Sequence, residues 1–460
     1  MTRHIATKHT SLFVLFMFTN AAFAQSISRS IIEPTIQPTE AIKQDTSTPK
    51  WKAEVEARFR FEARENTDFT NTKDDRSFFI GSRTRASISY QPSAEWKIFL
   101  QPQFSDVWGQ VSSQILGNGT LSPGLLTSAS TSDPYLSIHK AYVNWNIANS
   151  PAFLSIGRQE LNYGDHIILG NLGFSNVARS FDSGLIRWNP EQYTLDFICA
   201  KIAESDVKAS RLLGDADLAG VYAALGNLIS IPDFDLYVLW LRDKRSGTPV
   251  TFNFGTFGTR IKVASSIIDA RLEAGDANDH AMVAYMFDAE TGVNANKVRL
   301  AIEYNCASGD DPSTGKFTRY HQLFPTAHRW LGYMDFFGRQ NIQSAVLHTQ
   351  YKHSAALSLS ADVHSFWRSN SHDLLYSVVT ETPLSGQPSP ITSQNKHAGE
   401  ELDLGAQYKM NEHLTLEAMG GVLLPGTYLK LTGGAISYFN YLQSDPYPIY
   451  WTVDKRYKAV

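Results

Sequence analysis

The sequence predicts an all-β protein: a transmembrane antiparallel β-barrel of about 18 strands, within a range of about 16 to 18. Three observations predict it. Apolar and polar side chains alternate with a period of two over segments of about ten residues. Aromatic residues stand at the ends of these segments, and short connections alternate with long ones. Beyond the N-terminal segment, no apolar run is long enough to cross a bilayer as a helix.

The N-terminus has the pattern of a secretory signal peptide. Arg3 and Lys8 precede an apolar run over 12–18, and a stretch of small residues ends at Ala24. We therefore expect residues 1–24 to be removed on export. A membrane anchor is the alternative, but the apolar run is far shorter than the roughly 20 residues of a spanning helix.

The rest of the chain divides into a short lead-in and one large domain. Residues 25–50 are rich in Ser, Thr, Pro and Gln, which indicates a flexible segment, and 51–460 is the expected barrel. The net charge of −4 identifies no partner, and we expect no nucleic acid to bind. Two cysteines, Cys199 and Cys306, are too few to form a disulfide framework in 460 residues.

The first expected strand begins at Trp51 and has one charged and one apolar face. Its charged positions, which alternate with Ala, Val and Phe, are Glu54, Glu56, Arg58, Arg60, Glu62 and Arg64. A two-residue period places these side chains on one face. A soluble sandwich would also show one such strand, and it is the repetition of the pattern that favours a barrel.

The same alternation returns along the chain. The next polar sets are Arg83 with Arg85, Lys97 with Gln101 and Gln103, and Lys140 with Tyr142 and Asn144. The aromatic residues at segment ends are Tyr90, Trp96, Trp145 and Trp188. Later segments over 298–306, 355–366 and 414–423 continue the pattern, and 435–443 is the expected last strand.

The connections predict which end of the barrel carries the loops. Those at 91–95, 146–151 and 189–192 are short, whereas 107–133 and 160–180 are long. Outer-membrane barrels have short periplasmic turns and long extracellular loops. With the N-terminus in the periplasm, we expect the long loops to lie outside the cell or to fold into the lumen.

Several segments resemble the bacterial alginate export family. One is Gly157-Arg158-Gln159-Glu160-Leu161-Asn162-Tyr163-Gly164-Asp165, followed by Arg179-Ser180-Phe181-Asp182. The others are 323–333, 337–341, 400–403 and 424–428, so that the matches extend from about Trp51 to Gln443. The resemblance implies a monomeric outer-membrane barrel of about eighteen strands, with an electropositive constriction through which a polyuronate passes.

Arginines are the expected pore-lining residues. A guanidinium pairs with a carboxylate in a bidentate manner and stays charged at physiological pH. The candidates from strand parity are Arg58, Arg60, Arg83 and Arg85, and those from parity or motif are Arg158, Arg179, Arg187 and Arg339. Alternatively, these arginines pair with neighbouring acids in a salt-bridge network along the lumen, and both roles can coexist.

Two acids flank a long glycine-containing connection and complete the candidate site. Asp165 and Asp182 bracket a loop with Gly164, Gly170 and Gly173, which we expect to fold inward and narrow the pore. The acids would then tune selectivity or tie the loop to arginines of the wall. In the alternative interpretation, Asp165 only forms a turn after Gly164.

The sequence shows no motif of an enzyme. It has no Gly-x-Ser-x-Gly segment, and its histidines, such as His139, His328 and His364, have no metal-ligand spacing. We expect no cofactor, no metal and no catalytic residue, and a structural role for His328. An outer-membrane lipid-modifying enzyme would need a Ser/His pair on the lipid-facing side, which strand parity does not provide.

These observations predict an outer-membrane channel that conducts an anionic polysaccharide similar to alginate, in the export direction. Outer-membrane lipids would surround it, and export would require a periplasmic partner. The alternative is a general or carboxylate-selective porin for small anionic solutes. A porin would share every feature above except the family-like segments.

Overall fold

The computed structural model describes most of the chain from residue 50 onward. The described residues are 50–70, 75–108, 135–203, 215–229, 231, 233–244, 251–263, 266–277, 280–326, 328, 330–378, 382–389, 394–446 and 449–453. The expected signal peptide and the lead-in lie outside them, apart from Lys50, which already belongs to the first strand.

Nineteen strand segments form a single sheet. The first nine are β1 (Lys50–Glu65), β2 (Ser77–Gln91), β3 (Trp96–Trp108), β4 (Tyr135–Asn146), β5 (Ala152–Gln159), β6 (Phe181–Trp188), β7 (Thr194–Ala203), β8 (Ala216–Ala224) and β9 (Asp233–Asp243). The others are β10 (Phe252–Val263), β11 (Ser266–Ala277), β12 (His280–Ala295), β13 (Val298–Ala307), β14 (Ile342–Lys352), β15 (Leu357–Arg368), β16 (His397–Lys409), β17 (Leu414–Pro425), β18 (Ser437–Pro446) and β19 (Ile449–Val453).

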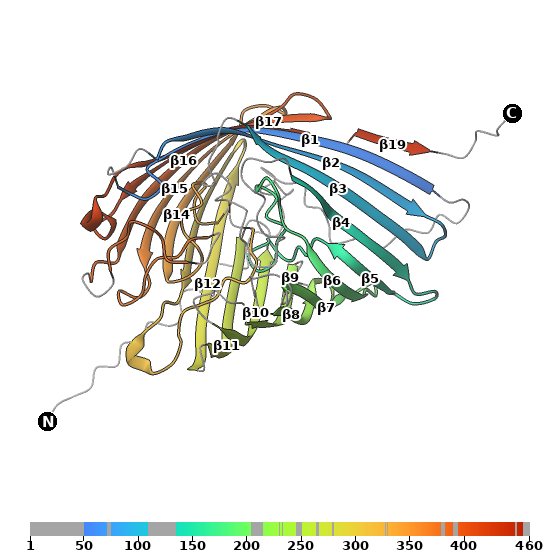
Figure 1. Ribbon diagram of the computed structural model, residues 1–460, viewed down its shortest axis with the longest axis horizontal. Coiled ribbons are helices and arrows are strands. Elements are labelled where there is room, and N and C mark those ends of the chain that lie inside the picture. The colour runs from blue at the N-terminus through green and yellow to red at the C-terminus, as the bar shows by residue number, and fades with distance from the viewer. Residues whose placement is uncertain are drawn as a thin grey trace.

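The sheet closes into a barrel because its first strand pairs with its last segments. From β1 to β18 each strand pairs antiparallel with the next in sequence, and β1 pairs with β18 over 59–65 and with β19 over 51–55. β18 and β19 together therefore occupy one position in a ring of eighteen. β19 lies beside β1 in Figure 1. Closure pairs the edges that an open sheet would expose. The predicted barrel is confirmed, and its last strand extends beyond the expected segment 435–443.

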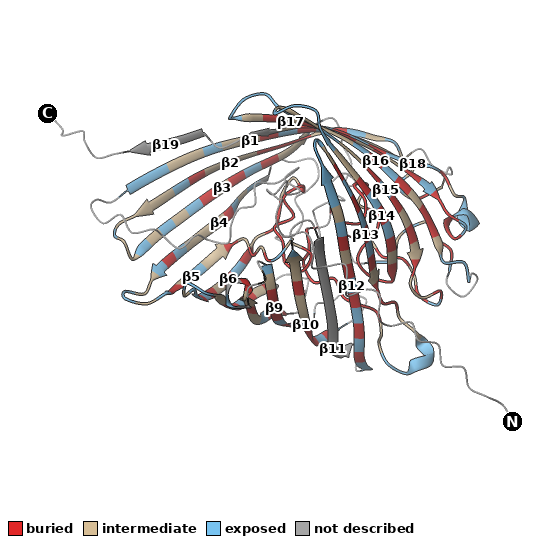
Figure 2. Ribbon diagram, turned by 180° about the vertical axis from the view of Figure 1, so that it is seen from behind, coloured by how far each residue is buried: buried red, intermediate tan, exposed pale blue. Residues whose placement is uncertain are grey.

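The alternation in sequence becomes an inward and an outward face. Arg58, Arg60 and Glu62 of β1 are buried inside the barrel, and Phe59 and Phe61 between them are exposed outside it. The same alternation runs along β9, β12 and β13, as the banded colouring of Figure 2 shows. A continuous apolar outer surface is typical of a barrel that faces lipid.

Aromatic residues form an outward band at the end of the barrel with the short turns. The indoles of Trp96 and Trp145, on β3 and β4, stack with ring centroids 5.6 Å apart. Trp51 and Tyr90, on β1 and β2, stack at 4.2 Å. Such rings fit the boundary between lipid and water, because their apolar body and polar tip prefer different sides of it.

Connections that follow even-numbered strands are short. Those after β2, β4, β6, β12, β14 and β16 contain between two and five residues. A four-residue helix, α1 (Gly226–Ile229), lies in the connection after β8. No helix in the described part of the chain is long and apolar enough to span a membrane.

Long connections at the other end fold into the barrel. The β5–β6 loop (160–180) and the β13–β14 loop (308–341) contribute much of one buried apolar cluster. Its loop residues include Leu161, Ile167, Ile168, Leu169, Phe174, Tyr320, Leu323, Phe324, Leu331 and Phe337. Buried loop traces lie inside the ring of strands (Figures 1 and 2). The core of this protein is therefore a plug within the lumen.

Candidate functional site: the barrel lumen

Four of the predicted arginines line one sector of the inner wall. Arg58 and Arg60 project inward from β1, and Arg83 and Arg85 project inward from β2; all four are buried. The register sets Arg58 directly opposite Arg83. Like charges facing each other across two strands repel, so this arginine wall requires acceptors for its guanidiniums.

Backbone carbonyls of the β5–β6 loop provide such acceptors. Arg58 donates to Gly173 O at 2.8 Å and to the carbonyls of Phe174 and Ser175 at 3.0 Å. Arg83 donates to Gly173 O at 2.9 Å and to Ser175 O at 3.1 Å. A peptide carbonyl carries no net charge. These bonds therefore hold the loop inside the barrel, and Arg83 Nη2 also lies 4.0 Å from Glu56 Oε1.

Arg60 and Arg85 are held in part by carboxylates of the same wall. Arg60 Nη2 lies 2.5 Å from Glu62 Oε1, and its guanidinium lies over the Phe174 ring, 3.8 Å from the centroid. Arg85 Nη1 lies 3.3 Å from Glu56 Oε1. Two of the four wall arginines, Arg60 and Arg85, thus form close ion pairs of the kind expected in a salt-bridge network along the lumen.

The two inward loops pair with each other through their backbones. Gly170 N donates to Phe324 O at 2.9 Å, and Thr326 N donates to His166 O at 2.9 Å. Arg179 strengthens this contact, because its Nη1 donates to Phe324 O at 2.6 Å and to Pro325 O at 2.9 Å. Arg179 is therefore buried between the loops, and these contacts join one loop to the other.

His328 connects the same two loops through its ring. The imidazole stacks on Phe174, with centroids 3.3 Å apart, and its Nδ1 lies 2.7 Å from Asp335 Oδ2. Burial lowers the pKa of His328, although the Asp335 carboxylate opposes the shift. The expected structural role of His328 agrees with these contacts.

Asp165 ties the β5–β6 loop to the wall. Its Oδ2 accepts a hydrogen bond from Arg260 Nη2 at 2.6 Å, and its Oδ1 lies 3.6 Å from Lys262 Nζ. Arg260 also lies 3.1 Å from Asp235 on the neighbouring strand β9. Of the roles expected for Asp165, these contacts provide a link from the loop to an arginine of the wall.

Arg187 and Arg339 face inward in buried ion pairs. Arg187 Nη2 lies 2.5 Å from Asp196 Oδ2, which also accepts from the Tyr163 hydroxyl at 2.8 Å. Burial and the nearby Asp196 carboxylate raise the pKa of Tyr163 well above its usual range. Arg339 Nη1 donates to Asp288 Oδ2 at 2.6 Å.

Arg158 and Asp182 do not line the lumen, and for these two residues the prediction was wrong. They share the outward parity of Ile156 and Ile186, and their side chains are 24% and 56% exposed. They form a bidentate ion pair with each other, at 2.7 and 2.8 Å. Ser155 and Gln159 are the buried polar residues of β5, and their parity is opposite to that of Arg158, so the two-residue period of this strand directs Arg158 outward.

Gly157, the first residue of the Gly157-Arg158-Gln159 segment, occupies a position that requires glycine. Its φ is +131°, and a Cβ there would lie 2.2 Å from the Ala141 carbonyl oxygen of β4. A side chain at this position would therefore clash with backbone and adopt a conformation that L-residues avoid.

A second sector of the inner wall is acidic, and the sequence interpretation missed it. Its inward residues on β12–β16 include Glu290, Glu303, His348, Asp362, His364, Glu401 and Asp403. Glu401 and Asp403 lie in the family-like segment 400–403. The two-residue alternation of these strands could have revealed these residues as inward, because each has the same parity as the buried residues of its strand.

The acidic wall holds the other loop. Glu401 Oε1 accepts from Met334 N at 3.0 Å, and Asp403 Oδ2 accepts from Tyr333 N at 3.2 Å. The arginine wall thus binds carbonyl oxygens of the β5–β6 loop, and the acidic wall binds N–H groups of the β13–β14 loop. The two sectors of the inner wall thus hold the two loops in different ways, with hydrogen-bond donors on one sector and acceptors on the other.

A closed, lipid-facing barrel with a charged inner wall and inward loops defines the class of outer-membrane channel proteins. The chain belongs to the alginate export family, whose model matches residues 51–202 and 243–442. The protein is located in the outer membrane. Its family and fold indicate a channel rather than an enzyme. None of the curated proteins compared with the chain matches it significantly.

Solved structures of outer-membrane proteins share the fold. OccK5 (OpdH) of Pseudomonas aeruginosa is 9% identical with a TM-score of 0.57, covering 88% of this chain and 98% of its own. OccAB1 of Acinetobacter baumannii is 11% identical with a TM-score of 0.57, covering 89% and 100%. OccAB2 of the same organism is 10% identical with a TM-score of 0.56, covering 88% and 98%. Identities this low bear on the fold alone.

Proposed function

We propose that this barrel conducts acidic saccharides of the uronate type across the outer membrane, in the export direction. The observation that supports the proposal most is the arginine wall, in which Arg58, Arg60, Arg83 and Arg85 share the inner face of two adjacent strands. A row of guanidiniums concentrates carboxylates and can pass them from one to the next. The family description supports the same class of cargo.

The contacts of the arginine wall suggest how cargo opens the path. Arg58 and Arg83 hold the β5–β6 loop by neutral carbonyls of Gly173 and Ser175. A carboxylate is a stronger acceptor for a guanidinium than a carbonyl is. An arriving uronate would therefore replace these carbonyls and release the loop, so that cargo binding and opening are coupled.

A second candidate is a channel for small carboxylates. The packing of both inward loops into one buried apolar cluster favours it, because a lumen filled in this way suits a solute smaller than a polymer. The two candidates differ in whether the loops leave the lumen during transport. We further propose that residues 1–24 are the signal peptide, that the barrel acts as a monomer, and that a periplasmic partner delivers the polymer.

Single-channel recording of the refolded protein in a planar bilayer tests the proposal. We expect an anion-selective current that oligomannuronate and oligogalacturonate block and that a neutral glucan of equal length leaves unchanged. A series of uronates from the monomer to the polymer separates the two candidates. Blockade that strengthens with chain length supports the saccharide conduit, and transport limited to monomers and dimers supports the small-solute channel.

Paired variants assign the effect to the arginine wall. Arg83→Gln removes one inward charge, and we expect lower anion selectivity and on the order of tenfold weaker uronate blockade, the effect of losing one charge-assisted contact of about 1.4 kcal/mol. Arg158→Gln is the matched control, because its side chain faces outward. Equal behaviour of the two variants, or a current indifferent to every uronate, would overturn the proposal.

A further inference from the structure

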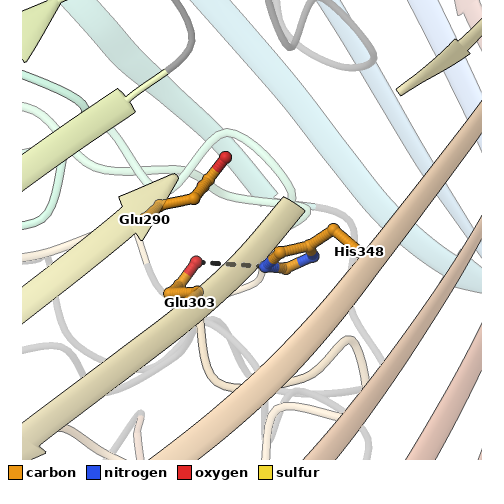
Figure 3. Close-up of side chains that lie close together, drawn as sticks. All are labelled: Glu290, Glu303 and His348. Carbon is orange, nitrogen blue, oxygen red and sulfur yellow. Dashed lines mark hydrogen bonds and ion pairs between the residues drawn. The ribbon is translucent and has the colours of Figure 1, made fainter. Parts of the chain in front are cut away.

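Three potential metal ligands converge on the inner face of neighbouring strands. Glu290 on β12, Glu303 on β13 and His348 on β14 each offer one ligand atom, and these atoms lie within 4.8 Å of one another (Figure 3). All three residues are buried. Glu290 and Glu303 are directly opposite in the strand register, where two carboxylates repel unless a cation lies near both.

The contacts around the cluster orient these groups for a metal ion. His348 Nδ1 lies 2.8 Å from Asp362 Oδ1, and its Nε2 points to Glu303 Oε2 at 3.2 Å. A hydrogen bond from Nδ1 to a carboxylate fixes the imidazole tautomer that presents Nε2 to a metal. Arg299 Nη2 lies 2.5 Å from Glu290 Oε1, so we assign the other oxygen, Oε2, to the metal.

We propose that Glu290, Glu303 and His348 bind a divalent transition-metal ion of the zinc class. One imidazole nitrogen and two carboxylate oxygens suit Zn²⁺, which lies about 2.0–2.2 Å from such atoms. Mg²⁺ and Ca²⁺ fit poorly, because they prefer oxygen ligands alone. Three protein ligands leave a fourth position for water or for a carboxylate in the lumen.

The site would connect three strands and place a positive charge in the acidic wall. Glu290, Glu303 and His348 come from consecutive strands, so a metal ion would cross-link the barrel wall over β12–β14. It would also weaken the negative potential of that wall. The proposed metal site does not depend on which cargo the barrel conducts, and its test uses no cargo.

Isothermal titration of the full mature chain, refolded in detergent and freed of metal with a chelator, tests the site. We expect one saturable site for Zn²⁺, none of similar affinity for Mg²⁺, and a rise in Tm with Zn²⁺. Glu303→Gln and His348→Ala should abolish this binding. Asp362→Asn, which disturbs only the orientation of the imidazole, should weaken it by on the order of tenfold.

His413→Ala is the matched control, because His413 is an exposed histidine in the turn after β16. It should bind Zn²⁺ as the wild type does. Glu303→Gln keeps the shape of the side chain, and the heat-dependent gel mobility of each variant reports whether the barrel has folded. Absence of a saturable Zn²⁺ site, or unchanged binding in folded Glu303→Gln, would overturn the proposal and leave an ion-pair network among Arg299, His348 and the acids.

Discussion

Phe174 and His328 stack face to face inside the barrel, with ring centroids 3.3 Å apart and an interplanar angle of 9°. Phe174 belongs to the β5–β6 loop and His328 to the β13–β14 loop, so the contact joins two of the loops that pack inside the barrel. Arg60 of the barrel wall lies over the same Phe174 ring. The position of the plug thus depends on a small group of side chains from the two loops and the wall.

Phe174→Ala should release the plug. Truncating a buried phenylalanine typically costs about 3–5 kcal/mol, and here that loss falls on the packing between the two loops. We expect a larger and noisier single-channel conductance at unchanged salt, with little change in the Tm of the barrel, whose strand pairing is untouched.

Phe197→Ala serves as the control for Phe174→Ala. Phe197 lies on the outward face of β7 and is exposed, so its removal should leave conductance unchanged. If Phe174→Ala also left conductance and current noise as in the wild type, the stack would not hold the plug in place.

Acidic pH should loosen the same contact. Burial holds the pKa of His328 below its ordinary value of 6.5, so the packed plug binds fewer protons than the released loop. The packing free energy therefore rises with pH, is fully present above about pH 6.5, and is lost as pH falls toward the lowered pKa. Conductance should therefore increase as the pH is lowered from about 8 to about 5.

His328→Gln removes this titration and should flatten the pH profile of conductance. His413→Gln alters an exposed histidine of a short turn and should retain the full profile. A profile of wild-type steepness in His328→Gln would assign the pH dependence to another group of the lumen.

Arg339→Ala should destabilise the barrel strongly. The guanidinium and Asp288 form a buried pair at 2.6 Å, and removing one partner leaves a buried charge, at a cost of about 3–5 kcal/mol. Urea unfolding in lipid vesicles, followed by tryptophan fluorescence, measures the loss. The double variant Arg339→Met with Asp288→Leu should recover most of it, and a double variant as unstable as the single one would contradict this account.

Gly157→Ala should impair folding although it adds only one methyl group. The Cβ would meet the Ala141 carbonyl oxygen at 2.2 Å, and φ of +131° excludes an ordinary L-residue. We expect a lower yield of heat-modifiable folded barrel on gels. Gly184→Ala is the control, because a Cβ there has no neighbour within 4 Å. Equal yields of the two variants would show that the strand adapts.

Much of the fold could be predicted because barrel strands repeat a local rule. Burial of Arg58 and exposure of Phe59 follow from a period of two, which neighbouring residues suffice to reveal. Applied to β5, the same rule directs Arg158 outward, because the buried polar residues Ser155 and Gln159 have the opposite parity. The family-like segment Gly157-Arg158-Gln159 gives no such direction, and the inward prediction for Arg158 was wrong.

The sequence by itself determined the barrel, the alternation of short and long connections, and the inward course of Arg58, Arg60, Arg83 and Arg85. Only the tertiary structure decided what these arginines bind and that an acidic wall lies in the same lumen. It also brought Glu290, Glu303 and His348 together. Their spacing along the chain forms no motif, because strand register and barrel closure, which involve residues far apart in sequence, set these distances.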